Sequence, residues 1–166
     1  MATRISNSVN LKNNDTYDIL LFGFPDGFPT SKLTFEFGGT PRRISGLEKV
    51  VQTFVKCLLT PRGSDPIYPS FGTDFQDFFM YSNVGTYDPA EVKSVVSGCI
   101  DDAMEQAKYI LNSSRYSKES QLDTVELISV TQGSEDTYIK MRILSKAGQY
   151  APIQLPFTST GITINE

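Results

Sequence analysis

Two long segments with helical periodicity are the feature that most constrains how this chain folds. In residues 44–60, "ISGLEKVVQTFVKCLLT", apolar side chains recur at steps of three and four residues. Residues 88–112 repeat this pattern and carry charged side chains on the opposite face. The two expected apolar stripes consist of Ile44, Leu47, Val50, Val51, Phe54, Val55 and Leu58, and of Val92, Val95, Val96, Cys99, Ile100, Ala103, Ala107 and Ile110. Each segment therefore predicts an amphipathic helix that packs one face against a core.

Signals for helix ends support both predictions. Ser45 is placed to cap the first helix, with Glu48 three residues later as in a capping box. Pro61 has no N–H group and disfavours a helical conformation at Thr60, so the first helix is expected to end there. Asp88 is placed to cap the second helix, and a proline follows it in the first turn.

Three extended segments follow the second helix. Residues 123–131, "DTVELISVT", and 137–145, "TYIKMRILS", flank a polar turn and predict a β-hairpin. In the next run, "QYAPIQLPF", Pro152 and Pro156 are four residues apart, so their missing N–H groups lie along one edge. The other edge keeps the donors of Ala151, Ile153, Leu155 and Phe157. Such a strand pairs on one side only, as an edge strand or as an arm added to a partner's sheet. As an arm, it could be deleted with the tail, residues 150–166, and leave a folded protein.

The N-terminal part predicts two short strands, within "YDILLFGF" and "KLTFEFGG". The aromatic loop between them, "FGFPDGFP", has two interpretations: a rigid turn that covers the core, or an exposed apolar knob that docks on a partner. The order of elements predicts an α+β fold with two helices on a small, mainly antiparallel sheet, an N-terminal two-strand extension and a C-terminal edge strand. We expect residues 1–43 to form the extension, 44–157 the core domain and 158–166 a tail.

Composition narrows the classes of function. A chain of 166 residues can form one core without a metal or disulfide. The net charge of -4 argues against nucleic acid as the main partner. No run of apolar residues is long enough to span a membrane. The polar start has no apolar signal-peptide core, so we expect a cytosolically made protein. Cys57 and Cys99 fall on apolar helical positions, which favours buried reduced thiols over a disulfide.

Carboxylates are the remaining route to enzymatic chemistry. The sequence contains no His, so it can form neither a Ser/His nor a Cys/His nucleophile pair. Asp65, Asp74, Asp77 and Glu119 are the candidates for the paired carboxylates of a glycosidase. The competing interpretation makes Asp65 and Asp74 turn residues that accept hydrogen bonds from local backbone N–H groups, and Asp77 a solvated side chain.

The connector between the helices, "TPRGSDPIYPSFGTDF" at residues 60–75, is unusually stiff and apolar. Three prolines restrict its course, and Gly72 is placed to allow a tight turn. We expect Phe71 and Phe75 to fill the gap between the helices as buried aromatic residues. The stretch is thus predicted to form the rigid centre of the domain, with Arg62 and Asp65 facing neighbours.

Residues 52–79, which include this connector, resemble the signature of the phage baseplate wedge family. That family includes the sheath initiators of contractile tails and has also carried the label "lysozyme-like". The matching residues are Leu58, Leu59, Thr60, Arg62, Gly63, Ser64, Pro66, Pro69, Phe71, Gly72, Asp74, Phe75 and Phe78. The order of elements also fits, so the resemblance covers roughly residues 44–157.

The resemblance implies a structural protein with no catalytic residues, metal or cofactor. Such proteins are virion components made in the host cytoplasm, and several copies form a sixfold ring in the tail baseplate. Their partners are baseplate wedge proteins, the tail sheath protein and the tube or hub, with no nucleic acid or membrane. They nucleate the sheath, and a strand typically joins the sheet of the first sheath ring. Similar proteins occur in type VI secretion machines and phage-tail-like bacteriocins.

The resemblance also divides the candidate site residues into a partner interface and a structural motif. The candidate partner interface consists of Arg62, Asp65, Glu119, Ile153, Leu155 and Phe157. The candidate structural motif consists of Thr60, Gly63, Pro66, Pro69, Phe71, Gly72, Asp74 and Phe75. The family's Glu-Pro-Arg before the first hairpin strand reads "KESQLD" here, so Ser120 and Gln121 replace Pro and Arg. The alternatives are a peptidoglycan-degrading enzyme that uses carboxylates, and an unrelated α+β interaction domain.

Overall fold

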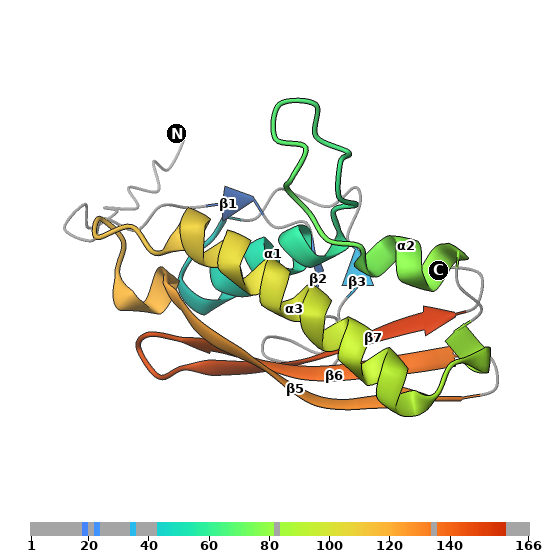
Figure 1. The fold of residues 1–166 in the computed structure, drawn as a ribbon. Coiled ribbons are helices and arrows are strands. Elements are labelled where there is room, and N and C mark those ends of the chain that lie inside the picture. Colours follow the sequence, from blue (N-terminus) through green and yellow to red (C-terminus); the bar gives the residue numbers. More distant parts are fainter. Residues whose placement is uncertain are drawn as a thin grey trace, which may run out of the picture.

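A three-stranded antiparallel sheet under two long helices forms the core (Figure 1). The computed structural model describes residues 18–19, 22–23, 34–35, 43–81, 84–133 and 136–158. The sheet has the order β5-β6-β7, from strands β5 (Leu122–Gln132), β6 (Asp136–Ser145) and β7 (Tyr150–Thr158). Helices α1 (Gly46–Leu59) and α3 (Pro89–Leu111) lie side by side on one face of it. The predicted α+β class, the hairpin and the C-terminal edge strand are confirmed.

The N-terminal extension forms two short antiparallel pairs. β1 (Asp18–Ile19) pairs with β4 (Arg43–Ile44), and β2 (Phe22–Gly23) pairs with β3 (Thr34–Phe35). The pairing of the two predicted N-terminal strands is therefore confirmed at β2 and β3. The loop of "FGFPDGFP" after Gly23 lies outside the described residues.

The extension is anchored on α1 through one carboxylate. Asp18 Oδ2 accepts hydrogen bonds from Gln52 Nε2 at 2.8 Å and from Lys56 Nζ at 3.1 Å. Gln52 is almost completely buried, so this carboxylate satisfies a polar side chain that α1 carries into the interior. The first strand is thus tied to the core domain by side chains as well as by its backbone pairing.

A third helix, α2 (Phe75–Tyr81), was not predicted from the sequence. Its residues Phe75, Phe78 and Phe79 recur at three- and four-residue spacing, which is typical of a helix, although the segment has only two turns. Phe75 and Phe79 are buried and contact Phe157 of β7, with ring centroids 5.0 and 4.6 Å apart respectively. Two short 3₁₀ helices, η1 (Val84–Thr86) and η2 (Lys118–Ser120), complete the described elements.

The buried face of α3 differs from the predicted stripe at two positions. Val95 and Ile110 are exposed, and Leu111 is fully buried instead. Leu111 lies four residues after Ala107, so it continues the buried row, whereas Ile110 falls on the flank of the helix. The other six predicted positions of this stripe are buried, and so are all seven on α1 and its N-terminal approach.

The two predicted N-caps have different outcomes. Asp88 caps α3, because its Oδ1 accepts a hydrogen bond from Ala90 N at 2.7 Å. The prediction for Ser45 is wrong, because its side chain makes no capping hydrogen bond. Ser120 of η2 replaces it: its buried Oγ accepts from Gly46 N at 3.1 Å. The hydrogen-bond acceptor for the first N–H group of α1 therefore comes from a residue 74 positions away.

Gly98 lies in the middle of α3 on its exposed side, and a Cβ there would meet nothing within 4 Å. We expect Gly98→Ala to raise the free energy of unfolding by about 1 kcal/mol, because alanine has the higher helix propensity. Chemical denaturation of both proteins measures the difference. Unchanged or lower stability would contradict the open surface at this position.

Both cysteines are free and buried, as predicted. Burial is the main cause that raises the pKa of the Cys57 and Cys99 thiols from 9.0 to about 11. A thiol whose pKa is higher in the folded state stabilises the fold below its unfolded pKa, and this contribution is lost as the pH rises toward 11. We therefore expect stability to fall between pH 9 and pH 11, and a soluble thiol reagent at pH 8 to label the chain only after unfolding. Rapid labelling of the native protein would contradict the buried positions.

Candidate protein-interaction site

The connector 60–75 forms a loop whose two ends lie side by side at the C-terminus of α1. Arg62 N donates to Thr73 O at 3.1 Å, and Thr73 N donates to Thr60 O at 2.9 Å. Below this pairing, the buried Thr73 Oγ1 donates to Leu58 O at 2.7 Å, which satisfies one of the last carbonyls of the helix. The base of the loop is therefore closed by backbone and side-chain hydrogen bonds.

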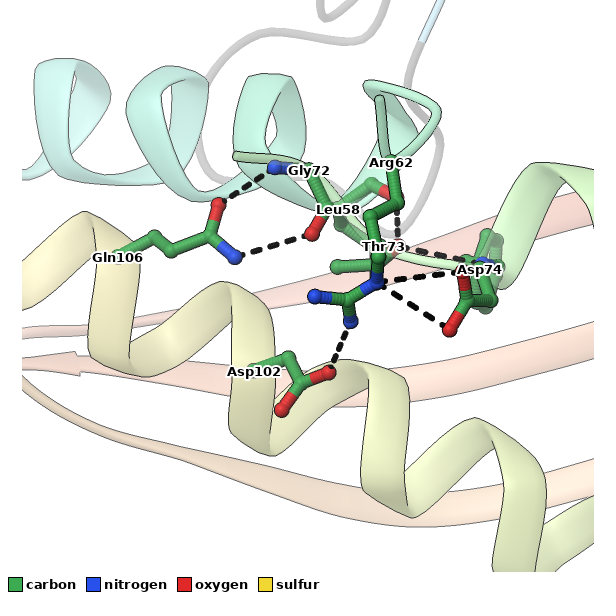
Figure 2. Close-up of polar contacts among 8 residues, drawn as sticks. Leu58, Arg62, Gly72, Thr73, Asp74, Asp102 and Gln106 are labelled. Atoms are coloured by element: carbon green, nitrogen blue, oxygen red, sulfur yellow. Dashed lines mark hydrogen bonds and ion pairs between the residues drawn. The ribbon is translucent and has the colours of Figure 1, made fainter. Parts of the chain in front are cut away.

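Helix α3 holds the same loop from the side through Gln106 (Figure 2). Its Oε1 accepts from Gly72 N at 2.8 Å, and its Nε2 donates to Gly72 O at 3.0 Å. One amide side chain thus satisfies both polar backbone groups of a single residue. This contact between α3 and the loop is specific, because an amide presents a donor and an acceptor together.

A guanidinium adds a second link between the loop and α3. Arg62 Nε lies 3.2 Å from Asp74 Oδ1, and its Nη2 donates to Asp102 Oδ2 (Figure 2). The hydrogen bond to Asp102 is the main cause that raises the pKa of Arg62. All three side chains are exposed, so this network orients the loop more than it stabilises the fold.

Gly72 is the position where the loop tolerates no side chain. Its φ is +93°, and a Cβ there would overlap Thr60 O and lie 2.9 Å from Pro61 O. We expect Gly72→Ala to cost more stability than Gly63→Ala, measured by chemical denaturation. Gly63 is the matched control, because it lies in the same loop at a φ of +81° with open space around it. Alanine at position 63 is strained only by the positive φ, so we expect Gly63→Ala to lower the free energy of unfolding by on the order of 1 kcal/mol. Equal costs would contradict the close approach at Gly72.

The middle of the loop projects away from the helices, at the top of Figure 1. Ile67 and Tyr68 are 76% and 67% exposed, and Pro66 and Pro69 beside them are exposed as well. We call residues 66–69 the loop tip. The prediction that the whole connector forms the centre of the domain is therefore wrong for the tip. Only the ends of the connector reach the core, where Gly72, Thr73 and Phe75 are buried.

The tip itself is held by local hydrogen bonds. Asp65 Oδ1 accepts from Ile67 N at 2.8 Å and from Tyr68 N at 3.1 Å, and Phe71 N donates to Tyr68 O at 2.9 Å. The prediction that Asp65 is a turn residue is confirmed. The same prediction for Asp74 is corrected, because its carboxylate receives Arg62 instead of local backbone N–H groups.

The two aromatic residues of the connector differ in burial. Phe75 is fully buried and contacts Phe79 and Phe157, each with ring centroids 5.0 Å apart. Phe71 is only partly buried and packs against the edge of the core. The prediction of a buried plug is thus confirmed for Phe75 and is wrong for Phe71, whose side chain stays partly exposed beside the core.

The strand residues predicted as a partner interface lie in this chain's own core. The side chains of Ile153, Leu155 and Phe157 are buried under the helices. In the ladder to β6, Pro152 lies opposite Arg142 and Pro156 opposite Tyr138. Because proline has no N–H, the donors toward β6 must come from the alternate residues. The edge predicted to serve a partner is therefore the one available to β6, and the outer edge of β7 is the one without the donors of Pro152 and Pro156.

The remaining predicted interface residues have varied surroundings. Arg62 binds Asp74 in the loop and Asp102 on α3, and Asp65 accepts hydrogen bonds within the loop. Glu119 is exposed on η2. At the two positions that depart from the family pattern, Ser120 is buried and caps α1. Gln121 Nε2 donates to Tyr116 O at 2.7 Å and to Ser113 O at 3.1 Å. The departing residues thus build a local hydrogen-bonded link before β5.

The candidate carboxylates for an enzyme do not converge through any described contact. Asp65 holds the loop tip, Asp74 binds Arg62, and Asp77 is exposed on α2. Within the described ranges, no three Cys, Asp or Glu side chains are grouped so that they could hold a metal ion. In the same part of the chain, no helix has both the length and the apolar character needed to cross a bilayer.

Sequence reasoning missed Gln106 and Asp102, the two α3 residues that hold the loop. Both lie on the polar flank of a helix, where their residue types give no signal of a tertiary contact. Comparison with known proteins adds no relative: no family model and no curated protein matches the sequence.

Proposed function

We propose that this protein is a structural component of the baseplate of a contractile phage tail or related injection system, where it links wedge proteins to the tube and nucleates the sheath. The observation that carries the proposal is the hydrogen-bonded loop 60–75. Residues of the resemblance take part in closing it: Thr60 and Arg62 pair with Thr73, and Gly72 is held by Gln106. Asp74 binds Arg62, and Phe75 is buried in the core. A stiff loop with an exposed apolar tip suits a protein that positions neighbours in an assembly.

Strand addition to the sheath is best supported at the outer edge of β5. That strand has no proline over Leu122–Gln132, and it is the end strand of the sheet in the described part of the chain. The outer edge of β7 lacks the donors of Pro152 and Pro156, which discourages pairing there. Main-chain hydrogen bonds give such added strands much of their affinity.

Hydrogen exchange distinguishes the two edges. In the assembled complex with sheath protein, we expect the backbone amides of β5 to gain protection relative to the free protein, while those of β7 stay unchanged. The β7 peptide is the internal control, because its donors already pair with β6. Protection gained at β7 alone would contradict strand addition at β5.

Loss of the protein tests the function itself. Tails produced without it are expected to carry a tube and baseplate parts but no sheath. A normal sheath on such tails would contradict the proposal. The enzymatic alternative predicts turnover of purified peptidoglycan that is lost on substitution of Asp65, Asp74, Asp77 or Glu119. An unrelated α+β interaction domain predicts no stable assembly with tube, wedge or sheath proteins.

A further inference from the structure

We infer that the loop tip, residues 66–69, inserts as an apolar knob into a concave apolar pocket on a different protein of the same particle. This inference rests on the proposed function and adds the site of one contact and the kind of surface that receives it. It starts from exposure: Ile67 and Tyr68 are adjacent, large and mostly exposed. The loop to which they belong projects from the domain (Figure 1). Adjacent exposed apolar side chains on a protruding segment are typical of interaction sites.

The tip is held in one conformation before any partner arrives. Pro66 and Pro69 flank the two side chains and restrict the backbone on both sides. Asp65 accepts two backbone hydrogen bonds inside the tip, and Gln106 holds the base of the loop at Gly72. A segment that is already ordered loses little conformational entropy on binding, so its apolar contacts translate into affinity efficiently.

The chemistry of the tip indicates which partner fits. Between Gly63 and Phe71 the only ionisable group apart from the Tyr68 phenol is Asp65, whose Oδ1 is occupied by backbone N–H groups. Nucleic acid and anionic membranes need basic residues, and this segment has none. Small ligands bind in concave sites, whereas the tip projects. A folded protein with an apolar pocket is the partner that remains, and the Tyr68 hydroxyl offers one hydrogen bond at its rim.

Site-specific photocrosslinking in assembled tails tests the inference. The full-length protein carries p-benzoylphenylalanine at position 68 or, in a matched control, at position 109. Tyr109 is also an exposed tyrosine, at 94%, but it lies on α3 and outside the loop. Both changes keep an aromatic ring at an exposed site, so neither should unfold the chain. The expected result is a single crosslinked tail protein from position 68 that is absent from the position 109 control.

The contrary outcomes are distinct. If the position 68 protein is present in the tails but forms no crosslink above the control, the inference fails and the proposed function stands. A crosslink to a second copy of this chain, to lipid or to nucleic acid also overturns it. If the unmodified protein is absent from purified tails, the proposed function fails, and this inference fails with it.

Discussion

Deletion of β7 with everything after it, residues 150–166, is expected to give a chain that does not fold. The deletion removes Ala151, Ile153, Leu155 and Phe157, which are all buried in the core. It also exposes the edge of β6 that now pairs with β7 along its length. Removing several core side chains at once costs more than the whole stability of a typical domain, because one large buried residue alone contributes about 2–5 kcal/mol. From the sequence, a chain without residues 150–166 is expected to stay folded and to fail only in seeding the sheath; the burial of β7 predicts instead that it does not fold.

Circular dichroism and amide NMR dispersion measure the outcome. Two point variants test separately whether the buried face of β7 is needed for folding. Ile153→Asp is the test and Gln154→Asp is its control. Ile153 points into the core, whereas the side chain of Gln154 is half-exposed on the other face. We expect the first variant to unfold and the second to remain folded. A folded deletion mutant with native NMR dispersion would show that β7 is an arm after all.

Phe75→Ala is expected to lower the free energy of unfolding by about 3–5 kcal/mol, as is typical when a buried aromatic side chain is truncated. Phe75 is fully buried where α2 meets β7, and its ring contacts those of Phe79 and Phe157. Its removal leaves a cavity that the loop above cannot fill, because Gly72 and Thr73 are fixed by hydrogen bonds.

Phe71→Ala is the matched control, since it removes the same side chain from the same loop. Phe71 is partly exposed, so less apolar area returns to water and the loss should be clearly smaller. Urea denaturation of the two variants beside the unmodified protein gives both values. Equal losses, or a larger loss for Phe71→Ala, would contradict the burial of Phe75 at the centre of the aromatic cluster.

The elements that depend on local pattern could be predicted from the sequence. The helices 46–59 and 89–111 follow from apolar periodicity, and the Asp88 cap follows from its position before a proline. The hairpin follows from alternation on both sides of a polar turn. In each case the interactions that decide the element form between residues a few positions apart, so the local sequence pattern is enough to predict it.

The features that were missed depend on residues far apart in the chain. Ser45 has the right type and spacing for a cap, yet Ser120 makes the hydrogen bond to Gly46, because η2 packs against the start of α1. Gln106 reaches Gly72 only because α3 lies beside the loop. The spacing of the β7 prolines predicts which edge of the strand lacks donors, but whether β6 or a partner pairs with the other edge is decided by packing. Such contacts require the fold itself.

The candidate site was only partly predictable for the same reason. Composition marked residues 60–75 as stiff and apolar, and Gly72 was expected to permit a tight turn. Ile67 and Phe75 are both large apolar residues, so the exposure of the first and the burial of the second could not be separated by residue type. The fold separates them: backbone hydrogen bonds of Thr73 with Thr60 and Arg62 close the base of the loop, and the middle of the loop is exposed.

The protein content of purified contractile tails tests the central claim most directly. Quantitative mass spectrometry of intact particles counts the copies of this chain relative to tube and sheath proteins. A structural baseplate component predicts a fixed number of copies that is a multiple of six and that stays with the particle through stringent washing. Absence of the chain from otherwise complete tails, or its presence in variable traces, would contradict a structural role in the baseplate.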